Sequence, residues 1–151
     1  RLDGFEIAPY DGTSYGRNVV AIKDATQDIN NGDTLIITTH YDSVLNSVGA
    51  NDNASGTAAL LELANAIKGE KTDTKIVFVF LSDTYNDYRG ARYFLSNMQN
   101  LNINPDKVIG VINVEKVGIN TKSGFKLITS DLKHTVVSEI LSSYAKRITK
   151  D

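Results

Sequence analysis

The sequence contains no cysteine and only two histidines among its 151 residues. It can therefore form no disulfide framework, and any metal ion must be held by histidine, aspartate, glutamate or water. A basic excess is also missing, because 16 lysines and arginines stand against 18 aspartates and glutamates. This balance favours neither a nucleic acid nor an anionic membrane surface as a partner. The longest apolar run, at 76–81, has the length of a strand and cannot span a membrane.

The remaining composition is that of a single domain with a substantial core. Hydrophobic residues make up 41% of the chain and charged residues 23%, which is ordinary for one compact soluble domain. No internal repeat, low-complexity tract or linker interrupts residues 1–151. We therefore expect one domain.

Hydrophobic periodicity predicts alternating strands and helices. Short apolar runs predict strands, and the i, i+3, i+4, i+7 spacing of apolar residues predicts helices. The runs at 76–81 and 108–114 are continuously apolar, which is typical of strands covered on both faces. The order is strand, strand, helix, strand, helix, strand, strand, helix, which predicts a three-layer α/β/α sandwich with a mixed, largely parallel sheet. The predicted strands are 18–22, 35–39, 76–81, 108–114 and 125–129, and the predicted helices are 56–68, 89–98 and 134–148.

Polar residues follow the predicted strands, at the edge where open α/β sheets bind their ligands. A lone histidine such as His40 is more often a capping or core residue. However, Asp42 follows it by two positions, on the same face of an extended strand, and this pairing favours a metal site. The full set at this edge is His40, Asp42, Asp52, Asp83, Thr84 and Glu115.

Asp52, Glu115 and His134 each have competing interpretations. Asp52, taken alone, is typical of an ordinary turn, with Ser55 as the N-cap of the next helix. Glu115 follows the apolar stretch 111–114, where a carboxylate is costly unless it is paired or bound to metal, so it favours a functional role. His134 opens the last predicted helix, and we expect it at the surface rather than as a metal ligand supplied by 130–134.

Two stretches, at 39–43 (Thr-His-Tyr-Asp-Ser) and 49–59 (Gly-Ala-Asn-Asp-Asn-Ala-Ser-Gly-Thr-Ala-Ala), resemble motifs of the two-zinc exopeptidases. That family includes bacterial leucyl aminopeptidase and the protease-like domains of the transferrin receptor type. The segments 78–81, 89–94 and 112–118 are similar to its following strands and helix, so the resemblance covers about Asn18 to Gly118. It implies that residues 1–151 are a fragment or truncated form of the family domain, and it favours an extracellular or cell-surface location. It also implies a peptide or protein as the partner, if the chain has one.

The resemblance also implies roles for particular residues. His40 and Glu115 would bind one zinc ion, Asp52 would bridge two zinc ions, and Asp42 would orient His40. The family normally has aspartate at the position of Glu115, a change that keeps the charge but lengthens the side chain. The peptide bond between Asp52 and Asn53 is expected to be cis.

The sequence departs from the family at the catalytic positions. Thr84 stands at the position of the general base and Tyr85 at a ligand position of the second zinc, while the family's last histidine ligand has no match. We therefore expect a degenerate site that holds at most one zinc ion and has little or no peptidase activity. The alternative is an active zinc aminopeptidase with Asp83 or Asp87 as the base and a missing ligand outside this chain. A flavodoxin-like binding module is disfavoured, because the loop around Asp52 lacks a glycine-rich phosphate-binding pattern.

Overall fold

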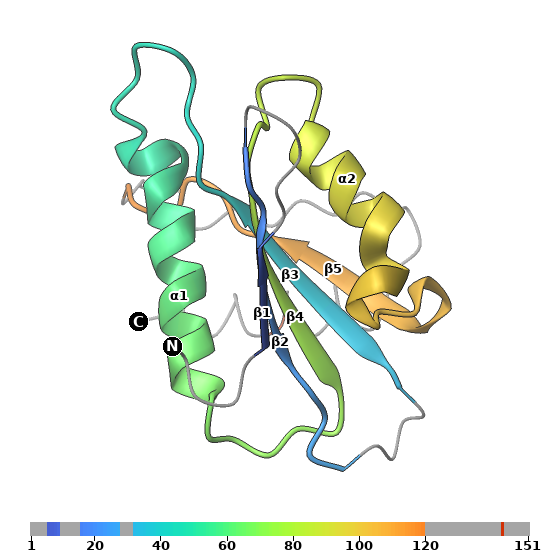
Figure 1. Cartoon of the computed structure of the whole chain (residues 1–151). Helices are drawn as coiled ribbons and strands as arrows, with labels where there is room; N and C mark the ends of the chain where they lie inside the picture. The colour runs from blue at the N-terminus through green and yellow to red at the C-terminus, as the bar shows by residue number, and fades with distance from the viewer. Residues whose placement is uncertain (1–5, 10–15, 28–31, 120–142, 144–151) are drawn as a thin grey trace. The chain divides into compact units, whose positions relative to one another are not determined.

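The computed structural model describes residues 6–9, 16–27, 32–119 and 143 (Figure 1). The strand expected at 125–129, most of the helix expected at 134–148, and His134 lie outside these residues. The chain divides into two compact units, residues 1–118 and residues 119–151, and all the helices and strands named below belong to the first. No helix in the described ranges is long and apolar enough to cross a bilayer.

A five-stranded sheet with the order β1-β2-β4-β3-β5 forms the centre of the first unit. β3 pairs in parallel with β4 and β5, whereas β2 pairs antiparallel with β1 and β4. β2 therefore runs against the other four strands, and the expected mixed sheet is confirmed, although its parallel and antiparallel pairings are equal in number. The strands are β1 (Glu6–Pro9), β2 (Val19–Lys23), β3 (Thr34–His40), β4 (Lys75–Leu81) and β5 (Val108–Asn113).

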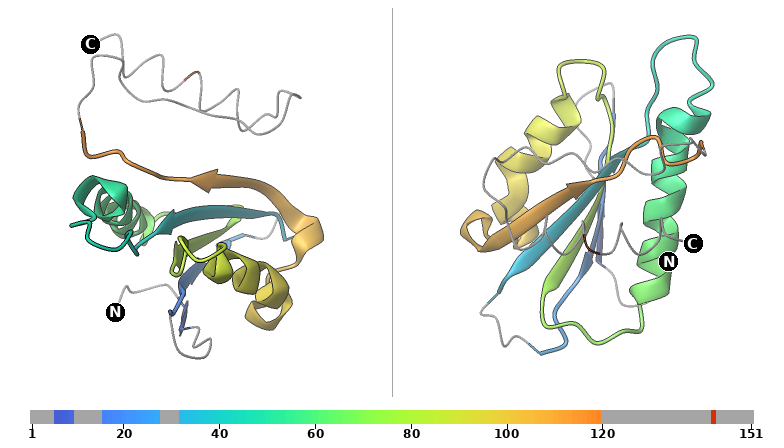
Figure 2. Two further views of the ribbon diagram at one scale, coloured as in Figure 1. Left: turned by 90° about the horizontal axis from the view of Figure 1, so that it is seen from above. Right: turned by 180° about the vertical axis from the view of Figure 1, so that it is seen from behind.

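Helices cover both faces of this sheet, as Figures 1 and 2 show. Leu60 and Ala64 of α1 (Ser55–Ile67) pack on one face against Phe78. Phe94 of α2 (Arg89–Asn97) packs on the other face against Val79. Phe78 and Val79 are fully buried because each side of β4 lies under a helix. The three-layer arrangement expected from the sequence is thus present in the first unit.

β1 and β5 differ from the expectations. β1 was not predicted because it is only four residues long and ends in proline, too short to show an alternating pattern. β5 was expected to be covered on both faces, but it is an edge strand of the described sheet. Its residues Ile109 and Val111 are 48% and 61% exposed. An apolar run alone does not distinguish a central strand from an edge strand.

The register brings the ends of the parallel strands together. His40 pairs with Leu81, and Thr38 pairs with Asn113, so β3, β4 and β5 end at one edge of the sheet. A short π-helical turn, η1 (Ala50–Ala54), precedes α1 at this edge. Two 3₁₀ turns, η2 (Met98–Leu101) and η3 (Pro105–Lys107), connect α2 to β5.

Candidate metal centre

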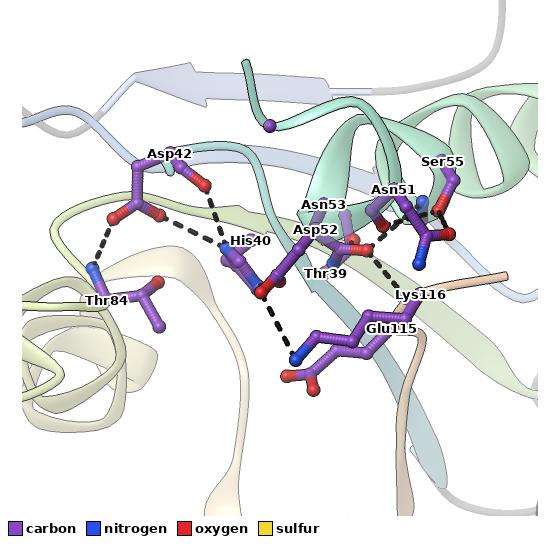
Figure 3. A network of polar contacts seen from close by, with 12 residues as sticks. Thr39, His40, Asp42, Asn51, Asp52, Asn53, Ser55, Thr84, Glu115 and Lys116 are labelled. Atoms are coloured by element: carbon purple, nitrogen blue, oxygen red, sulfur yellow. Dashed lines mark hydrogen bonds and ion pairs between the residues drawn. The ribbon is translucent and has the colours of Figure 1, made fainter. Parts of the chain in front are cut away.

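His40 ends β3 and is almost fully buried, with 4% of its surface exposed. Its Nδ1 lies 3.0 Å from the carbonyl oxygen of Asp42 and 3.5 Å from Asp42 Oδ1 (Figure 3). Asp42 Oδ2 in turn accepts a hydrogen bond of 2.7 Å from the backbone N–H of Thr84. Asp42 therefore lies behind His40, as expected. However, its nearer contact with the ring is through its backbone carbonyl, because β3 ends before Asp42.

Asp52 faces the other nitrogen of the His40 ring. Its Oδ1 lies 3.2 Å from His40 Nε2, and this oxygen is buried without a hydrogen-bond partner. When Nδ1–H of the neutral ring donates to the Asp42 carbonyl, Nε2 carries a lone pair, so two acceptors face each other. A cation between them makes this arrangement favourable. Two ligand atoms at about 2.0–2.1 Å from a tetrahedral zinc ion are about 3.3 Å apart, so these residues fit a zinc ion.

The second carboxylate oxygen of Asp52 faces a cation of the chain itself. Lys116 Nζ lies 3.2 Å from Asp52 Oδ2 (Figure 3). Burial acts to raise the pKa of Asp52, but hydrogen bonds from Lys116 and Tyr85 and the charge of Lys116 hold that pKa below its ordinary value. Burial raises the pKa of Tyr85, and its hydrogen bond to Asp52 raises it further. Asp52 is thus ionised at neutral pH and Tyr85 is neutral.

Glu115 does not join His40 and Asp52. It lies beyond the end of β5 on an exposed segment, and its Oε1 accepts a hydrogen bond of 2.8 Å from Asn113 Nδ2. Within the described ranges, no three histidine or acidic side chains gather closely enough to hold a metal ion. The structure therefore brings together two of the three expected ligands. The argument that burial makes Glu115 costly does not apply, because Glu115 is exposed.

Asn53 fixes the loop that carries Asp52, and sequence reasoning missed it. Its buried Nδ2 donates to Thr39 Oγ1 (2.9 Å) and to the Val114 carbonyl (3.0 Å). Its Oδ1 accepts from the backbone N–H groups of Gly56 (3.2 Å) and Lys116 (3.0 Å). One side chain thus ties β3, the start of α1 and the segment after β5 together. The peptide bond between Asp52 and Asn53 is cis, which confirms that expectation.

Asn51 and Ser55 hold the later part of the segment that follows β5. Asn51 Oδ1 accepts from Gly118 N–H at 3.0 Å, and Ser55 Oγ accepts from Val117 N–H at 3.1 Å. Ser55 was expected to cap α1, but it lies inside the first turn and donates to the Asn51 carbonyl at 2.8 Å. Only the small polar residues Asn51, Asn53 and Ser55 signal these contacts in the sequence.

In the described loop between β4 and α2, both aspartates are paired with arginines. Asp83 Oδ2 lies 3.4 Å from Arg89 Nε, and the exposed Asp87 forms an ion pair with Arg92. The backbone of Thr84 supports Asp42, whereas Tyr85 stands with its ring edge-on to His40 at 5.6 Å and 85°. The two aspartates considered as replacement bases are therefore paired with arginines.

Comparisons with known proteins find relatives by sequence and by fold. The sequence model of peptidase family M28 matches residues 18–151. Aminopeptidase YwaD of Bacillus subtilis is 29% identical over 116 residues, which are 77% of this chain and 25% of that protein.

Two solved structures share the fold. The structure of BSAP, a zinc aminopeptidase from Bacillus subtilis, matches with a TM-score of 0.74 at 27% sequence identity. The match covers 90% of this chain and 33% of the BSAP chain. The structure of an aminopeptidase from Aneurinibacillus sp. strain AM-1 matches with a TM-score of 0.60 at 34% sequence identity. That match covers 68% of this chain and 25% of the aminopeptidase chain. The chain thus spans about a quarter to a third of the length of these relatives.

Proposed function

This chain belongs to peptidase family M28, and we propose that it is a zinc-aminopeptidase-like domain that binds at most one zinc ion and has little or no peptidase activity. The observation that carries the proposal is the environment of Asp52. Asp52 Oδ1 lies 3.2 Å from His40 Nε2, a separation that suits two ligands of one zinc ion. Lys116 forms an ion pair with Oδ2 of the same carboxylate, and Tyr85 donates a hydrogen bond to it. This environment supports the binding of one metal ion between Asp52 and His40.

His40 Nε2 and Asp52 Oδ1 would hold the zinc ion, with Glu115 as a candidate third ligand. The Asp42 carbonyl fixes the ring by accepting from Nδ1, which leaves Nε2 free to coordinate. When bound, zinc polarises a carbonyl group and lowers the pKa of a water molecule. For Glu115 to contribute, it would have to give up its hydrogen bond to Asn113.

Efficient hydrolysis also requires a proton acceptor. By the family resemblance this acceptor would stand at position 84, where threonine has no group that titrates near neutrality. General-base catalysis is worth about 10²- to 10⁴-fold in rate. Tyr85 is a poor metal ligand because its pKa is raised by burial and by its hydrogen bond to Asp52. Asp83 and Asp87 are paired with Arg89 and Arg92.

The first test is the zinc content of the purified chain. After dialysis against micromolar zinc, we expect no more than one tightly bound zinc ion per chain by elemental analysis. His40→Ala should abolish that binding, whereas His134→Ala, which removes the only other histidine, should leave it unchanged. Two tightly bound zinc ions, or no effect of His40→Ala, would contradict the proposed site.

The second test is hydrolysis of aminoacyl chromogenic substrates with added zinc or cobalt. We expect no turnover above that of the His40→Ala variant, which controls for contaminating peptidases. Chelator-sensitive turnover by the unmodified chain alone would refute the degenerate-site proposal and support the alternative of an active zinc aminopeptidase. Asp83→Asn and Asp87→Asn would then show which carboxylate serves as the base.

A further inference from the structure

Lys116 is placed by the same loop that carries Asp52. Its backbone N–H donates to Asn53 Oδ1 at 3.0 Å, and its φ of 53° lies in the left-handed region that non-glycine residues rarely adopt. Val117 and Gly118, which follow it, are held by Ser55 and Asn51. This backbone directs the lysine side chain toward Asp52, as Figure 3 shows.

The two oxygens of Asp52 face different partners. Oδ1 lies 3.2 Å from the buried ring of His40, and Oδ2 lies 3.2 Å from the Lys116 ammonium group. A carboxylate can bind one cation at each oxygen, and on Asp52 the chain already supplies the cation at Oδ2. Tyr85 adds a hydrogen bond to the same carboxylate from a neutral hydroxyl group.

We propose that the Lys116 ammonium group is a built-in cation that occupies Oδ2 of Asp52 and thereby excludes a second metal ion from the site. This inference rests on the proposed function, in which His40 and Asp52 hold a single zinc ion. A divalent ion at Oδ2 would have to displace the ammonium group or lie beside its positive charge. Lys116 requires no further ligand, because water solvates the part of its side chain that stays exposed.

Substitutions of Lys116 separate the effect of its side-chain length from the effect of its charge. Lys116→Met keeps most of the side-chain length but removes the charge, whereas Lys116→Arg keeps the charge. Lys116→Gln is a second neutral variant with a polar end. Because the Lys116 side chain is 56% exposed, these substitutions should leave the fold intact, which circular dichroism checks.

The experiment is calorimetric titration of each metal-free chain with zinc chloride, with bound zinc confirmed by elemental analysis. We expect one zinc ion on the unmodified chain and on Lys116→Arg. Lys116→Met and Lys116→Gln should bind a second zinc ion at least about tenfold more tightly than the unmodified chain does. The absorption spectrum of bound cobalt should show the same change in stoichiometry.

Each other outcome has a separate meaning. One zinc ion on every variant, with unchanged affinity for a second, would overturn the role of Lys116 and leave the one-zinc proposal standing. No zinc on the unmodified chain but one on Lys116→Met would refute zinc binding by His40 and Asp52 in the unmodified chain, while supporting exclusion of a metal ion by Lys116. No zinc on any variant, or two tightly bound zinc ions on the unmodified chain, would overturn both.

Discussion

Replacing Asn53 with alanine should destabilise the fold far more than an average asparagine substitution. Asn53 is 1% exposed, and its side chain is the hydrogen-bond partner of the Gly56 and Lys116 N–H groups. Each buried group left without a partner costs about 1–3 kcal/mol. The Val114 carbonyl keeps its hydrogen bond from Thr39, so the loss comes mainly from the two N–H groups and amounts to about 2–6 kcal/mol.

Urea unfolding followed by circular dichroism measures this loss. With a slope of about 2 kcal/mol per molar urea, a loss near 4 kcal/mol lowers the midpoint by about 2 M. Asn100→Ala is the matched control, because the exposed Asn100 makes one side-chain hydrogen bond, to Asn97, and should change the free energy of unfolding by less than about 0.5 kcal/mol. Equal midpoints for the Asn53 and Asn100 variants, at unchanged slope, would refute the reasoning.

Three further predictions concern neighbouring residues. Gly56→Ala should destabilise by about 3 kcal/mol in the same assay, because the new Cβ would lie 2.6 Å from the Val114 carbonyl oxygen. The tyrosinate titration of the unmodified chain minus that of Tyr85→Phe should have its midpoint above 10.0, since burial and then the Asp52 hydrogen bond raise the pKa of Tyr85. The stabilisation of the fold that comes from the raised pKa of Tyr85 should be complete below pH 10 and lost as the pH rises through that raised pKa. A titration midpoint below 10.0 would contradict this prediction. Asn113→Ala should free Glu115 and increase zinc affinity several-fold by calorimetry, and unchanged affinity would argue against Glu115 as a ligand.

The sequence predicted the central elements because their patterns are set by burial. The run at 76–81 became β4, whose residues Val77 to Val79 are fully buried between two helices. The change from continuous apolar runs to apolar residues at helical spacing predicted the bounds of α1 and α2 to within about two residues. The position of β5 at the edge of the described sheet depends on which strands pair, and strand pairing is not encoded in the apolar run itself.

The sequence predicted part of the candidate site, namely the residues whose positions follow from the ends of the strands. His40 follows directly from the end of a strand, and Asp52 follows from the loop that the parallel connection must place at the same edge. The contact of Lys116 could not be predicted. It depends on a left-handed backbone conformation and on a hydrogen bond that the Lys116 N–H donates to Asn53, a residue 63 positions away. Likewise, Glu115 turns toward Asn113 because β5 ends at Asn113 and leaves Glu115 exposed.

The hydrogen bonds that stabilise the site are separate from the positions that would perform its chemistry. Asn51, Asn53 and Ser55 bind the backbone at 114–118, and none of these contacts involves the side chain of Thr84 or Tyr85. Thr84 contributes a backbone N–H to Asp42, which any residue except proline supplies. Substitution at position 84 should therefore cost the fold little, whereas substitution within 51–55 should disrupt the site. A domain built in this way would keep its fold and the pairing of His40 with Asp52 even if position 84 lost a proton acceptor, which is what the proposed function requires.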